Sequence, residues 1–580
     1  MAMSLRLVVV LVAVASPVPG QTMWYVDDDA CPGPGSGSQG DPFCRIQDGI
    51  AAASGGDTVL VLPGTYFESI DFLGKAIEVK SSGGAAATVI VGDGVTGAGV
   101  TPVVTFANGE GRDSLLEGFT ITGGGLFTTV AGILCWSSPT IRANIIKENS
   151  GYDGAGGIIS TANALIVQNV FLDNGATFST GGMSLSGTTV AEDNWIEGNA
   201  SGYHVGGMSC FGNSVLRRNT IVGNWTACGL VGGVLCGGNA RLEDNRILRN
   251  TYTIDALIGG VLCSGDCVLE GNEIADNQGG ILAGGADDDQ PTLLNNLICG
   301  NAGGGITCDG GQLSLVNNTI HGNGPGNAAG GITCYYGGMV TVANSILWND
   351  QGSSAPEIAA IGTGAIVDLS WSDVEGGQAS VFSSAGGSVQ WGPGMIDSDP
   401  LFVDPDGLDD DPATIDDNDF HVVAISPCVD SADNDAPQLP AEDFEGDPRP
   451  VDVPGTPDTG NGTPPLADMG FDEFHSHLYF NGDATPGGGV ALIVTSLPFG
   501  SPVIVWFAVG ALDPPLSTNL GFWHLAPPLF PLFLPPIPAD GIDSVFGHLP
   551  STPPAPYTIY SQAVIGSIPA LTNLAVLAIE

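Results

Sequence analysis

The chain carries one short asparagine pattern that recurs at a nearly constant spacing. The pattern is Asn-x-apolar-x-x-Asn, and from its first to its last copy the mean spacing is 25 residues. A repeat of this length indicates a solenoid, in which each copy forms one coil stacked on the next. The copies begin at Asn144, Asn169, Asn194, Asn219, Asn245, Asn272, Asn296, Asn318 and Asn344.

A second pattern runs in phase with the first and indicates that each coil is built from strands. Two glycines precede an apolar residue in successive copies, from Gly156-Gly157-Ile158 to Gly330-Gly331-Ile332. Between these signals, short apolar runs are separated by Gly, Asn, Asp and Ser, which leaves no room for a helix. Three short strands per repeat predict an all-β parallel solenoid of about twelve coils.

Stacking turns every repeated position into a ladder, because equivalent residues of successive coils lie about 4.8 Å apart. A stacked asparagine amide can bond its neighbours above and below and satisfy turn backbone. We therefore expect the nine asparagines to form a structural ladder rather than a ligand site. A column of cysteines indicates stacked small core residues, with a disulfide between neighbouring coils left open. Its members are Cys135, Cys210, Cys236, Cys263, Cys308 and Cys334.

The charge of the chain excludes one large class of partners. The sequence has 13 Lys and Arg against 62 Asp and Glu, a formal net charge of −49. Such a chain repels polyphosphates and anionic membranes, so we expect no nucleic-acid partner. Cations and neutral extracellular polysaccharides or cell-surface glycans remain as partners, and we expect a monomer.

The N-terminus has the features of an export signal. Arg6 precedes an apolar run from Leu7 to Ala15, and small residues follow up to Gly20. We expect the mature chain to be secreted or held at the cell surface, with no transmembrane segment, because no later stretch reaches ~18 uninterrupted apolar residues. In an exported chain, Cys31 and Cys44 flank a Gly/Ser/Pro loop and predict a disulfide.

Motifs at both ends of the repeat resemble a known group of proteins. Trp24-Tyr25-Val26-Asp27-Asp28 and Pro63-Gly64-Thr65-Tyr66 are similar to the opening of secreted bacterial right-handed parallel β-helix proteins, the pectin-lyase-like group. Asp399-Pro400-Leu401-Phe402, Asp419-Phe420-His421 and Ser426-Pro427-Cys428-Val429-Asp430 resemble their closing segment. The resemblance covers about residues 24–474 and implies a right-handed parallel β-helix. The last segment resembles a recurring C-terminal β-domain of such proteins, and its apolar runs between Pro/Gly turns predict a small β-sandwich-like domain.

The resemblance leaves the activity open, because enzymes and non-catalytic surface proteins share this architecture. The Gly-His-Gly and Arg-x-Lys strings of pectin-degrading hydrolases do not occur in the sequence. Lyases of this fold use Lys or Arg as a base, and the regular coils contain few such residues besides Lys147. We favour a non-catalytic protein with a glycan-binding, adhesive or structural role, and keep an extracellular polysaccharide lyase or glycoside hydrolase as the alternative.

One acidic segment offers hard oxygen ligands around a glycine turn, the ligands that Ca²⁺ prefers. Its spacing is not that of an EF-hand, and a plain solvated loop is the alternative. The candidate calcium ligands are Asp404, Asp406, Asp409 and Asp411.

These patterns divide the chain into six segments. They are a signal peptide (1–20), an N-terminal cap with irregular first coils (21–131), nine regular coils (132–350), closing coils with the acidic loop (351–436), an irregular cover or linker (437–477) and the C-terminal β-domain (478–580).

Overall fold

The computed structural model describes residues 21–579 with gaps, and side chains up to residue 474. Two compact units are present, one with Met1–Thr292, Asn301–Leu313 and Tyr335–Gly338, the other with Leu293–Gly300, Ser314–Cys334 and Met339–Glu580. No helix in the described residues is long and apolar enough to cross a membrane. The gaps are 93–101, 126–130, 254–256, 285–288, 326–327, 408–417, 454–455, 475–477, 483–488, 496–502, 509–510, 519–520, 526–529, 535–541, 549–556, 566–569 and 572–574.

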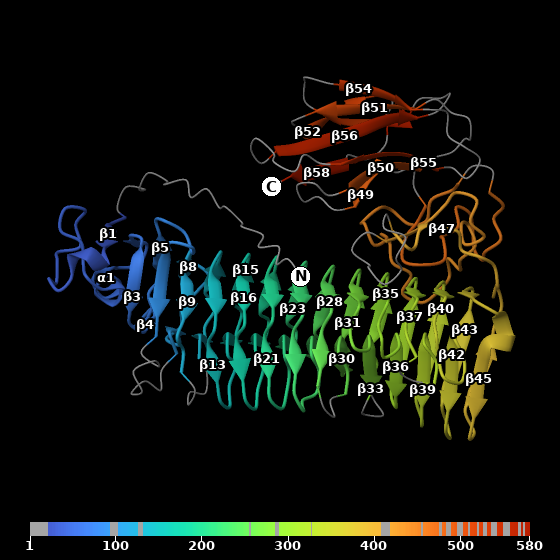
Figure 1. Ribbon diagram of the computed structural model, residues 1–580, viewed down its shortest axis with the longest axis horizontal. Helices are drawn as coiled ribbons and strands as arrows, with labels where there is room; N and C mark the ends of the chain where they lie inside the picture. The colour runs from blue at the N-terminus through green and yellow to red at the C-terminus, as the bar shows by residue number, and fades with distance from the viewer. Residues whose placement is uncertain are drawn as a thin grey trace. The chain divides into compact units, whose positions relative to one another are not determined.

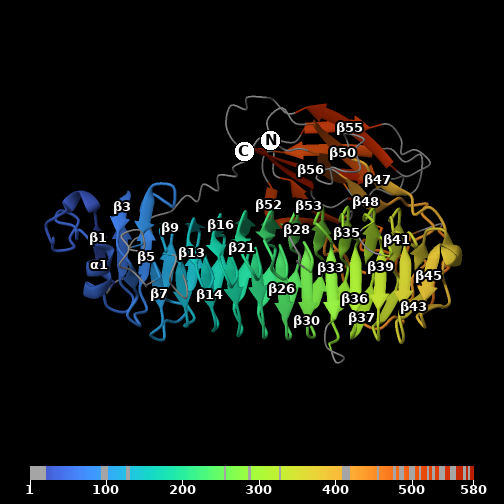
Figure 2. The same cartoon turned by 60° about the horizontal axis from the view of Figure 1, so that its bottom comes forward.

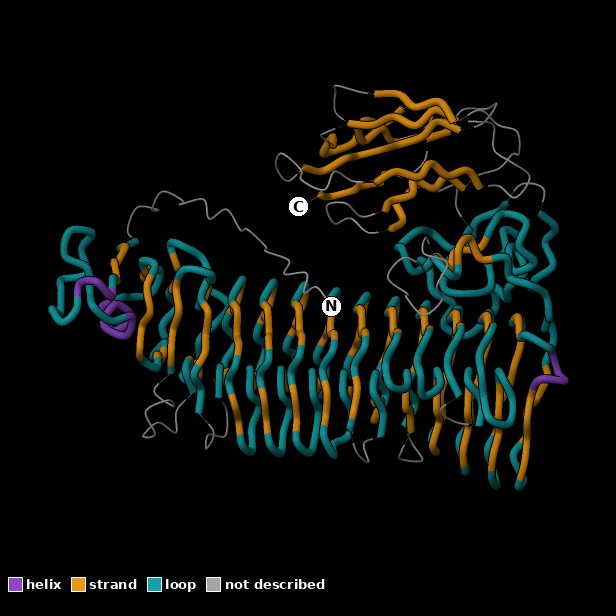
Figure 3. Tube along the Cα trace, viewed as in Figure 1, coloured by secondary structure: helices purple, strands orange, loops and turns teal. Residues whose placement is uncertain are grey.

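The predicted all-β parallel solenoid is confirmed, with about 12 turns and three long sheets. Strands of one sheet follow one another in coil order (Figure 1), the rotated view shows the same order (Figure 2), and short loops join the strands within each coil (Figure 3). All described pairs between successive coils in these sheets are parallel, as the repeat requires.

The strands of the three long sheets have the following bounds. Sheet 1 contains β1 (Met23–Val26), β2 (Thr58–Val61), β5 (Glu78–Ser81), β8 (Leu115–Glu117), β11 (Thr140–Arg142), β15 (Leu165–Val167), β19 (Val190–Glu192), β23 (Val215–Arg217), β27 (Arg241–Glu243), β31 (Val268–Glu270), β34 (Thr292–Leu294), β37 (Gln312–Val316), β40 (Met339–Ala343), β43 (Ile366–Ser370) and β46 (Ser388–Trp391). Sheet 2 contains β4 (Ile70–Asp71), β7 (Val104–Phe106), β10 (Ile133–Cys135), β14 (Ile158–Ser160), β18 (Met183–Leu185), β22 (Met208–Cys210), β26 (Val234–Gly237), β30 (Val261–Ser264), β33 (Ile281–Gly284), β36 (Ile306–Asp309), β39 (Ile332–Tyr335), β42 (Ile358–Ile361) and β45 (Val381–Ser384). Sheet 3 contains β3 (Gly64–Phe67), β6 (Thr88–Val91), β9 (Thr120–Thr122), β12 (Ile145–Lys147), β16 (Val170–Leu172), β20 (Trp195–Glu197), β24 (Thr220–Val222), β28 (Arg246–Leu248), β32 (Glu273–Ala275), β35 (Leu297–Cys299), β38 (Thr319–His321), β41 (Ile346–Trp348) and β44 (Asp373–Val374).

A fourth, shorter parallel sheet runs along part of the first unit. It contains β13 (Ser150–Gly151), β17 (Gly175–Ala176), β21 (Ala200–Ser201), β25 (Trp225–Thr226) and β29 (Thr251–Tyr252).

The core of the first unit consists of apolar side chains stacked in register. Ile146 of β12 pairs with Phe171 of β16, which pairs with Ile196 of β20, and all three are fully buried. In each of these strands the central residue points inward and its two neighbours are partly exposed. The cysteine column behaves likewise: Cys236 and Cys263 are buried free thiols whose Sγ atoms lie 3.5 Å apart.

Buried asparagines form two hydrogen-bonded ladders along the coils. Asn169 Nδ2 donates to the Ile141 carbonyl at 2.9 Å and to Asn194 Oδ1 at 3.1 Å, and its N–H donates to the same Oδ1 at 2.9 Å. The second asparagine of each repeat does the same, as Asn174 does toward Asn199. Each amide therefore satisfies backbone groups of its own coil and of the preceding one, and bonds the asparagine side chain of the following coil. The described bonds of the first ladder join Asn144, Asn169, Asn194, Asn219, Asn245 and Asn272, and separately Asn296 and Asn318.

The structure corrects the prediction for the ninth ladder residue, Asn344. Asn344 has a φ of 54°, and its Nδ2 donates to Asn317 Oδ1 at 3.3 Å, so it lies at the left-handed corner one residue before the ladder. Ser345 holds the ladder position and accepts from the Asn318 N–H at 3.2 Å. Asparagine tolerates the left-handed conformation well, so one residue type suits both positions and the pattern slips by one.

The second ladder also ends one residue later than the pattern predicts, at Asp350 rather than Asn349. Asp350 Oδ1 accepts from the Asn323 N–H at 2.7 Å and from Asn323 Nδ2 at 2.9 Å. Its Oδ2, like Glu357 Oε2, is buried without a hydrogen-bond partner. Burial raises the pKa of Asp350 to about 7 and that of Glu357 to about 11, so this pair keeps at least one proton at neutral pH.

We expect Asp350→Asn to stabilise the protein more at pH 8 than at pH 5. The folded-state pKa of Asp350 lies above its unfolded value, so its contribution to stability is lost as pH rises through about 7. The amide keeps the acceptor for Asn323 and removes the charge. The gain in the free energy of unfolding should be about 2 kcal/mol larger at pH 8, measured by urea unfolding. An equal change at both pH values would contradict a shared proton.

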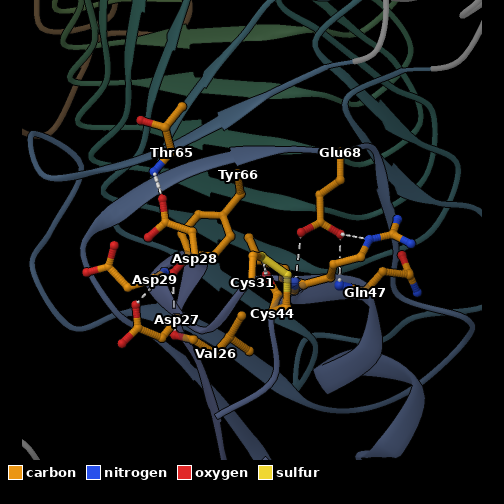
Figure 4. Close-up of a disulfide and its surroundings, with 12 residues drawn as sticks. Val26, Asp27, Asp28, Asp29, Cys31, Cys44, Gln47, Thr65, Tyr66 and Glu68 are labelled. Atoms are coloured by element: carbon orange, nitrogen blue, oxygen red, sulfur yellow. Dashed lines mark hydrogen bonds and ion pairs between the residues drawn. A yellow bond between two sulfur atoms is a disulfide. The ribbon is translucent and has the colours of Figure 1, made fainter. Parts of the chain in front are cut away.

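The N-terminal cap is held by side chains around the disulfide Cys31–Cys44, whose Cα atoms lie 4.9 Å apart (Figure 4). The Glu68 carboxylate accepts from the first N–H groups of α1 (Ile46–Ala52), at 2.8 Å from Ile46 and 3.1 Å from Gln47. These bonds satisfy donors that a helix N-terminus leaves open. The cap therefore covers the first coil with a short helix whose start is paired.

The closing segment packs back onto the last coils of the second unit. It contains the antiparallel pair β47 (Phe402–Asp404) and β48 (Asp419–Val422). Elsewhere, the described residues include the 3-10 turns Asp28–Ala30 and Gly377–Ser380, which lie between strands of the solenoid. Asn317 Nδ2 donates to the Asp468 carbonyl at 2.8 Å, and the Phe471 N–H donates to Thr319 Oγ1 at 3.3 Å. Residues 428–474 thus cover β38 and β41 with a buried core of their own that includes Cys428, Val453 and Met469.

The C-terminal segment forms antiparallel sheets, in contrast to the coils. β50 pairs with β49 and β55, and β51 pairs with β54 and β56. The side-chain packing of the predicted sandwich lies outside the described residues. The strands are β49 (Leu478–Gly482), β50 (Gly489–Thr495), β51 (Val503–Ala508), β52 (Ala511–Thr518), β53 (Gly521–Leu525), β54 (Phe530–Leu534), β55 (Ile542–His548), β56 (Tyr557–Ile565), β57 (Ala570–Leu571) and β58 (Ala575–Ile579).

Candidate functional site

A pocket of about 330 Å³ lies in the second unit, where the closing segment meets sheet 3. One wall comes from β38 and β41, and the other from the segment that leads into β47. Its volume is at the lower end of the range for small-molecule sites. The lining residues are His321, Trp348, Asn349, Asp399, Leu401, Phe402 and Pro405.

The coil register determines which side chains form the first wall. His321 of β38 pairs with Trp348 of β41, so the two side chains are neighbours in one column of sheet 3. Asn349 follows at a left-handed corner, with a φ of 59°, and its N–H donates to Glu375 Oε2 at 2.7 Å. An imidazole and an indole on adjacent strands, and an exposed amide at the corner that follows, therefore line the same pocket.

The second wall is held by a turn and by aromatic contacts. Asp399 Oδ1 accepts from the Leu401 N–H at 3.0 Å, which fixes the turn before β47. The Phe402 ring meets His321 edge to face, with centroids 5.5 Å apart, and Phe420 of β48 contacts both rings. The pocket therefore combines aromatic surface with one exposed carboxylate and one amide.

His321 is neutral at physiological pH. Its side chain is buried, and this burial lowers its pKa to about 4. A base with so low a pKa is poorly matched to proton abstraction near pH 7. Neutral imidazole can still donate one hydrogen bond and accept another, which suits a hydroxyl group.

The described lining of the pocket offers one carboxylate and no Lys or Arg, whereas glycan-cleaving enzymes use paired carboxylates or a basic residue. Glycoside hydrolases use two carboxyl groups, whereas Asp399 is the single acidic residue in the described lining. Basic residues are engaged elsewhere: within residues 21–474 each Lys and Arg contacts a carboxylate, except Lys75 and Arg112, which donate to neutral oxygens. The hydrogen bonds that Arg218 donates to Asp193 and that Arg241 donates to Glu243 raise the pKa of each guanidinium, which opposes a role as base.

A second aromatic surface lies along the first unit. Phe178 stacks on Tyr203 with ring centroids 5.1 Å apart, and Tyr152 meets Phe178 edge to face at 5.1 Å. All three side chains are exposed. Because the rings pack on one another, much of their face area is not available to a ligand. Their main effect is to join successive coils.

The predicted calcium loop is only partly within the described residues. Asp404 ends β47 opposite Asp419 of β48, and Asp406 lies in the turn that follows. Asp409 and Asp411 lie outside the described residues. Calcium at this loop therefore stays a prediction.

A partly buried histidine in the closing segment lies close to three carboxylates. His421 Nδ1 lies 2.6 Å from Asp419 Oδ1, and its Nε2 lies 3.0 Å from Glu445 Oε1 and 4.0 Å from Asp472 Oδ1. Burial disfavours the charged ring, but the three carboxylates together hold the pKa of His421 well above its usual value. His421, Glu445 and Asp472 could hold a metal ion, yet the protonated imidazole already supplies the positive charge they require.

The sequence patterns did not single out the pocket residues. His321 and Trp348 occupy a repeat position that carries Cys299 one coil earlier, so no recurring signal marks them. Asp399 and Phe402 fall in Asp399-Pro400-Leu401-Phe402, a closing motif of the pectin-lyase-like resemblance. The motif indicates a family, but it does not say which coil its residues face.

Three comparisons with known proteins show what this chain is similar to. Residues 231–347 match the sequence model of the family described as "Right handed beta helix region", so the solenoid is a right-handed parallel β-helix. No curated protein matches. Among solved structures, a XylC complex with xylose is 10% identical over 66% of this chain and 87% of its own, with a TM-score of 0.38. A pectate lyase, Pel9A, is 13% identical over 79% and 98%, with 0.31. The A-module of an Azotobacter vinelandii mannuronan C-5 epimerase is 18% identical over 65% and 100%, with 0.33.

Proposed function

We propose that this protein is a secreted or cell-surface β-helix protein that binds a neutral glycan in the pocket beside Trp348 and does not cleave it. The observation that carries the proposal is the lining of that pocket, where indole and phenyl rings stand beside an amide, a carboxylate and a neutral imidazole. Aromatic faces pack against the C–H face of a sugar ring, and the polar groups can bond its hydroxyls.

The charges favour a neutral glycan over a polyuronate. Asp399 is exposed in the pocket, its described lining contains no Lys or Arg, and the whole chain carries a net charge of −49. An anionic polysaccharide would be repelled at long range and would find no cation to pair with on arrival.

Export is supported by two observations. The Cys31–Cys44 disulfide is typical of proteins that fold in oxidising compartments. The apolar run between Arg6 and Gly20, which lies outside the described residues, has the pattern of a signal peptide. Both support a secreted or cell-surface location.

We expect Trp348→Ala to weaken binding of neutral oligosaccharides at least tenfold, because it removes the largest apolar face of the pocket. The measurement is isothermal titration with oligosaccharides of xylose, mannose, glucose and galactose. Trp136→Ala is the matched control, since Trp136 is 61% exposed and lies outside the pocket. Equal losses in the two variants, or binding confined to polygalacturonate or alginate, would contradict the proposal.

A further inference from the structure

A buried aspartate in the closing segment lies beside two further carboxylates. Asp430 is fully buried, and its carboxylate lies close to those of Asp452 and Asp458, with one oxygen from each residue within 4.8 Å of the others. Asp452 and Asp458 are exposed, so solvent reaches one side of the group.

The backbone holds Asp430 rigidly in this position. Its N–H donates to Asp468 Oδ1 at 2.7 Å, and its carbonyl accepts from the Thr459 N–H at 3.0 Å and the Gly460 N–H at 3.2 Å. Asp430 also has a φ of 51°, a conformation that aspartate tolerates better than most residues. The bonds from Thr459 and Gly460 therefore hold Asp458, the residue before Thr459, beside Asp430.

Neither carboxylate oxygen of Asp430 has a hydrogen-bond partner, although both are buried. Burial raises the pKa of Asp430 to about 7. The Val453 N–H opposes this rise, but it does not meet hydrogen-bond geometry. A buried carboxylate without partners costs several kcal/mol unless it is protonated or neutralised by a cation.

The neighbouring charges make this cost larger. Three acidic side chains, Asp452, Asp458 and Glu473, add to the effect of burial and disfavour the charged form of Asp430. Arg449 contacts Glu473 at 3.6 Å and donates to the carbonyls of Asp468 and Phe471. The His421 group differs on this point, because an imidazole lies among its carboxylates.

We propose that Asp430, Asp452 and Asp458 bind a calcium ion. All three ligands are carboxylate oxygens, two of them are open to water, and no His or Cys belongs to the group. Ca²⁺ accepts six to eight oxygen ligands in flexible geometry and can take water at the open side, whereas Zn²⁺ favours His and Cys. The ion would tie the segment around Asp452 and Asp458 to the core of the closing segment.

The test uses the full chain after removal of metal with a chelator. Calorimetric titration should show one Ca²⁺ bound per chain through this site. The melting temperature should rise by a few degrees at a hundredfold excess over the dissociation constant. Magnesium at equal concentration, and sodium chloride at equal ionic strength, should give clearly smaller shifts, since screening acts on all exposed charges. Equal shifts with all three salts would overturn the proposal.

Substitutions separate this site from the acidic loop. Asp452→Asn with Asp458→Asn changes exposed residues only, and it should abolish the calcium-specific shift. Asp406→Asn should leave that shift intact, and its loss in this control would place the ion at the acidic loop and overturn the proposal.

The substitution Asp430→Asn distinguishes a calcium ligand from a residue that only stabilises the fold. Without calcium this variant should melt at the same temperature as the parent or higher, because it removes a buried unpaired charge. It should also lose the calcium response. A variant that melts lower without calcium and still responds to it would contradict the assignment.

Discussion

Replacing Asn199 with Ala should lower the free energy of unfolding by about 3–5 kcal/mol. Asn199 Nδ2 donates to the Phe171 carbonyl and to Asn224 Oδ1, both at 3.0 Å, and its Oδ1 accepts from the Asn174 N–H and Nδ2 at 3.0 Å. Alanine leaves these groups buried without partners, and no water can reach them in a closed coil.

Urea unfolding followed by circular dichroism measures this effect. Asn213→Ala is the matched control, because Asn213 accepts from Asn239 Nδ2 at 3.3 Å on an exposed turn. The control should change stability by less than about 0.5 kcal/mol. Similar losses of unfolding free energy in both variants would show that the buried ladder stabilises the protein no more than an exposed asparagine does.

Gly207→Ala should be comparably harmful, with a loss of about 3 kcal/mol or more. A Cβ at this buried position would lie 2.6 Å from the Gly233 carbonyl oxygen of the next coil and 3.2 Å from Asn224 Cγ. The coil cannot move away, since the Gly207 N–H donates to the Gly232 carbonyl at 2.9 Å and Asn224 belongs to the ladder.

Gly111→Ala provides the comparison for that substitution. Gly111 is exposed, and a Cβ there would have no atom within 4 Å. Its effect on the urea midpoint should be small. If Gly207→Ala changed the urea midpoint as little as Gly111→Ala, the inference that neighbouring coils approach closely at the glycine pairs would be wrong.

The fold was predictable because local spacing and global contact coincide in a solenoid. Asn169 and Asn194 meet in space since they are one repeat apart in sequence, so periodicity alone indicates the ladder. The same reasoning misplaced Asn344, because asparagine suits both the ladder and the left-handed corner before it. A strict repeat therefore predicts the position of a residue within its coil to within one residue. The backbone conformation then determines which of two adjacent residues occupies the ladder.

The candidate sites were less predictable because they join segments that no period relates. The pocket brings His321 of one coil to Asp399 and Phe402, which follow the last coils. The proposed calcium group joins Asp430 to Asp452 and Asp458, which lie more than twenty residues later in the closing segment. The acidic loop is recognisable in the sequence by its density of aspartates. No sequence pattern distinguishes a single aspartate that is buried without hydrogen-bond partners.

Direct analysis of the glycan after binding tests the central claim, a neutral-glycan-binding protein that does not cleave. The purified chain is titrated with the neutral oligosaccharides of the panel, and the same samples are then examined by mass spectrometry and for new reducing or unsaturated ends. We predict saturable binding to at least one neutral glycan that is lost in Trp348→Ala, with the oligosaccharide recovered intact. New ends that appear with the parent chain and not with Trp348→Ala would contradict it and make the protein a glycoside hydrolase or polysaccharide lyase.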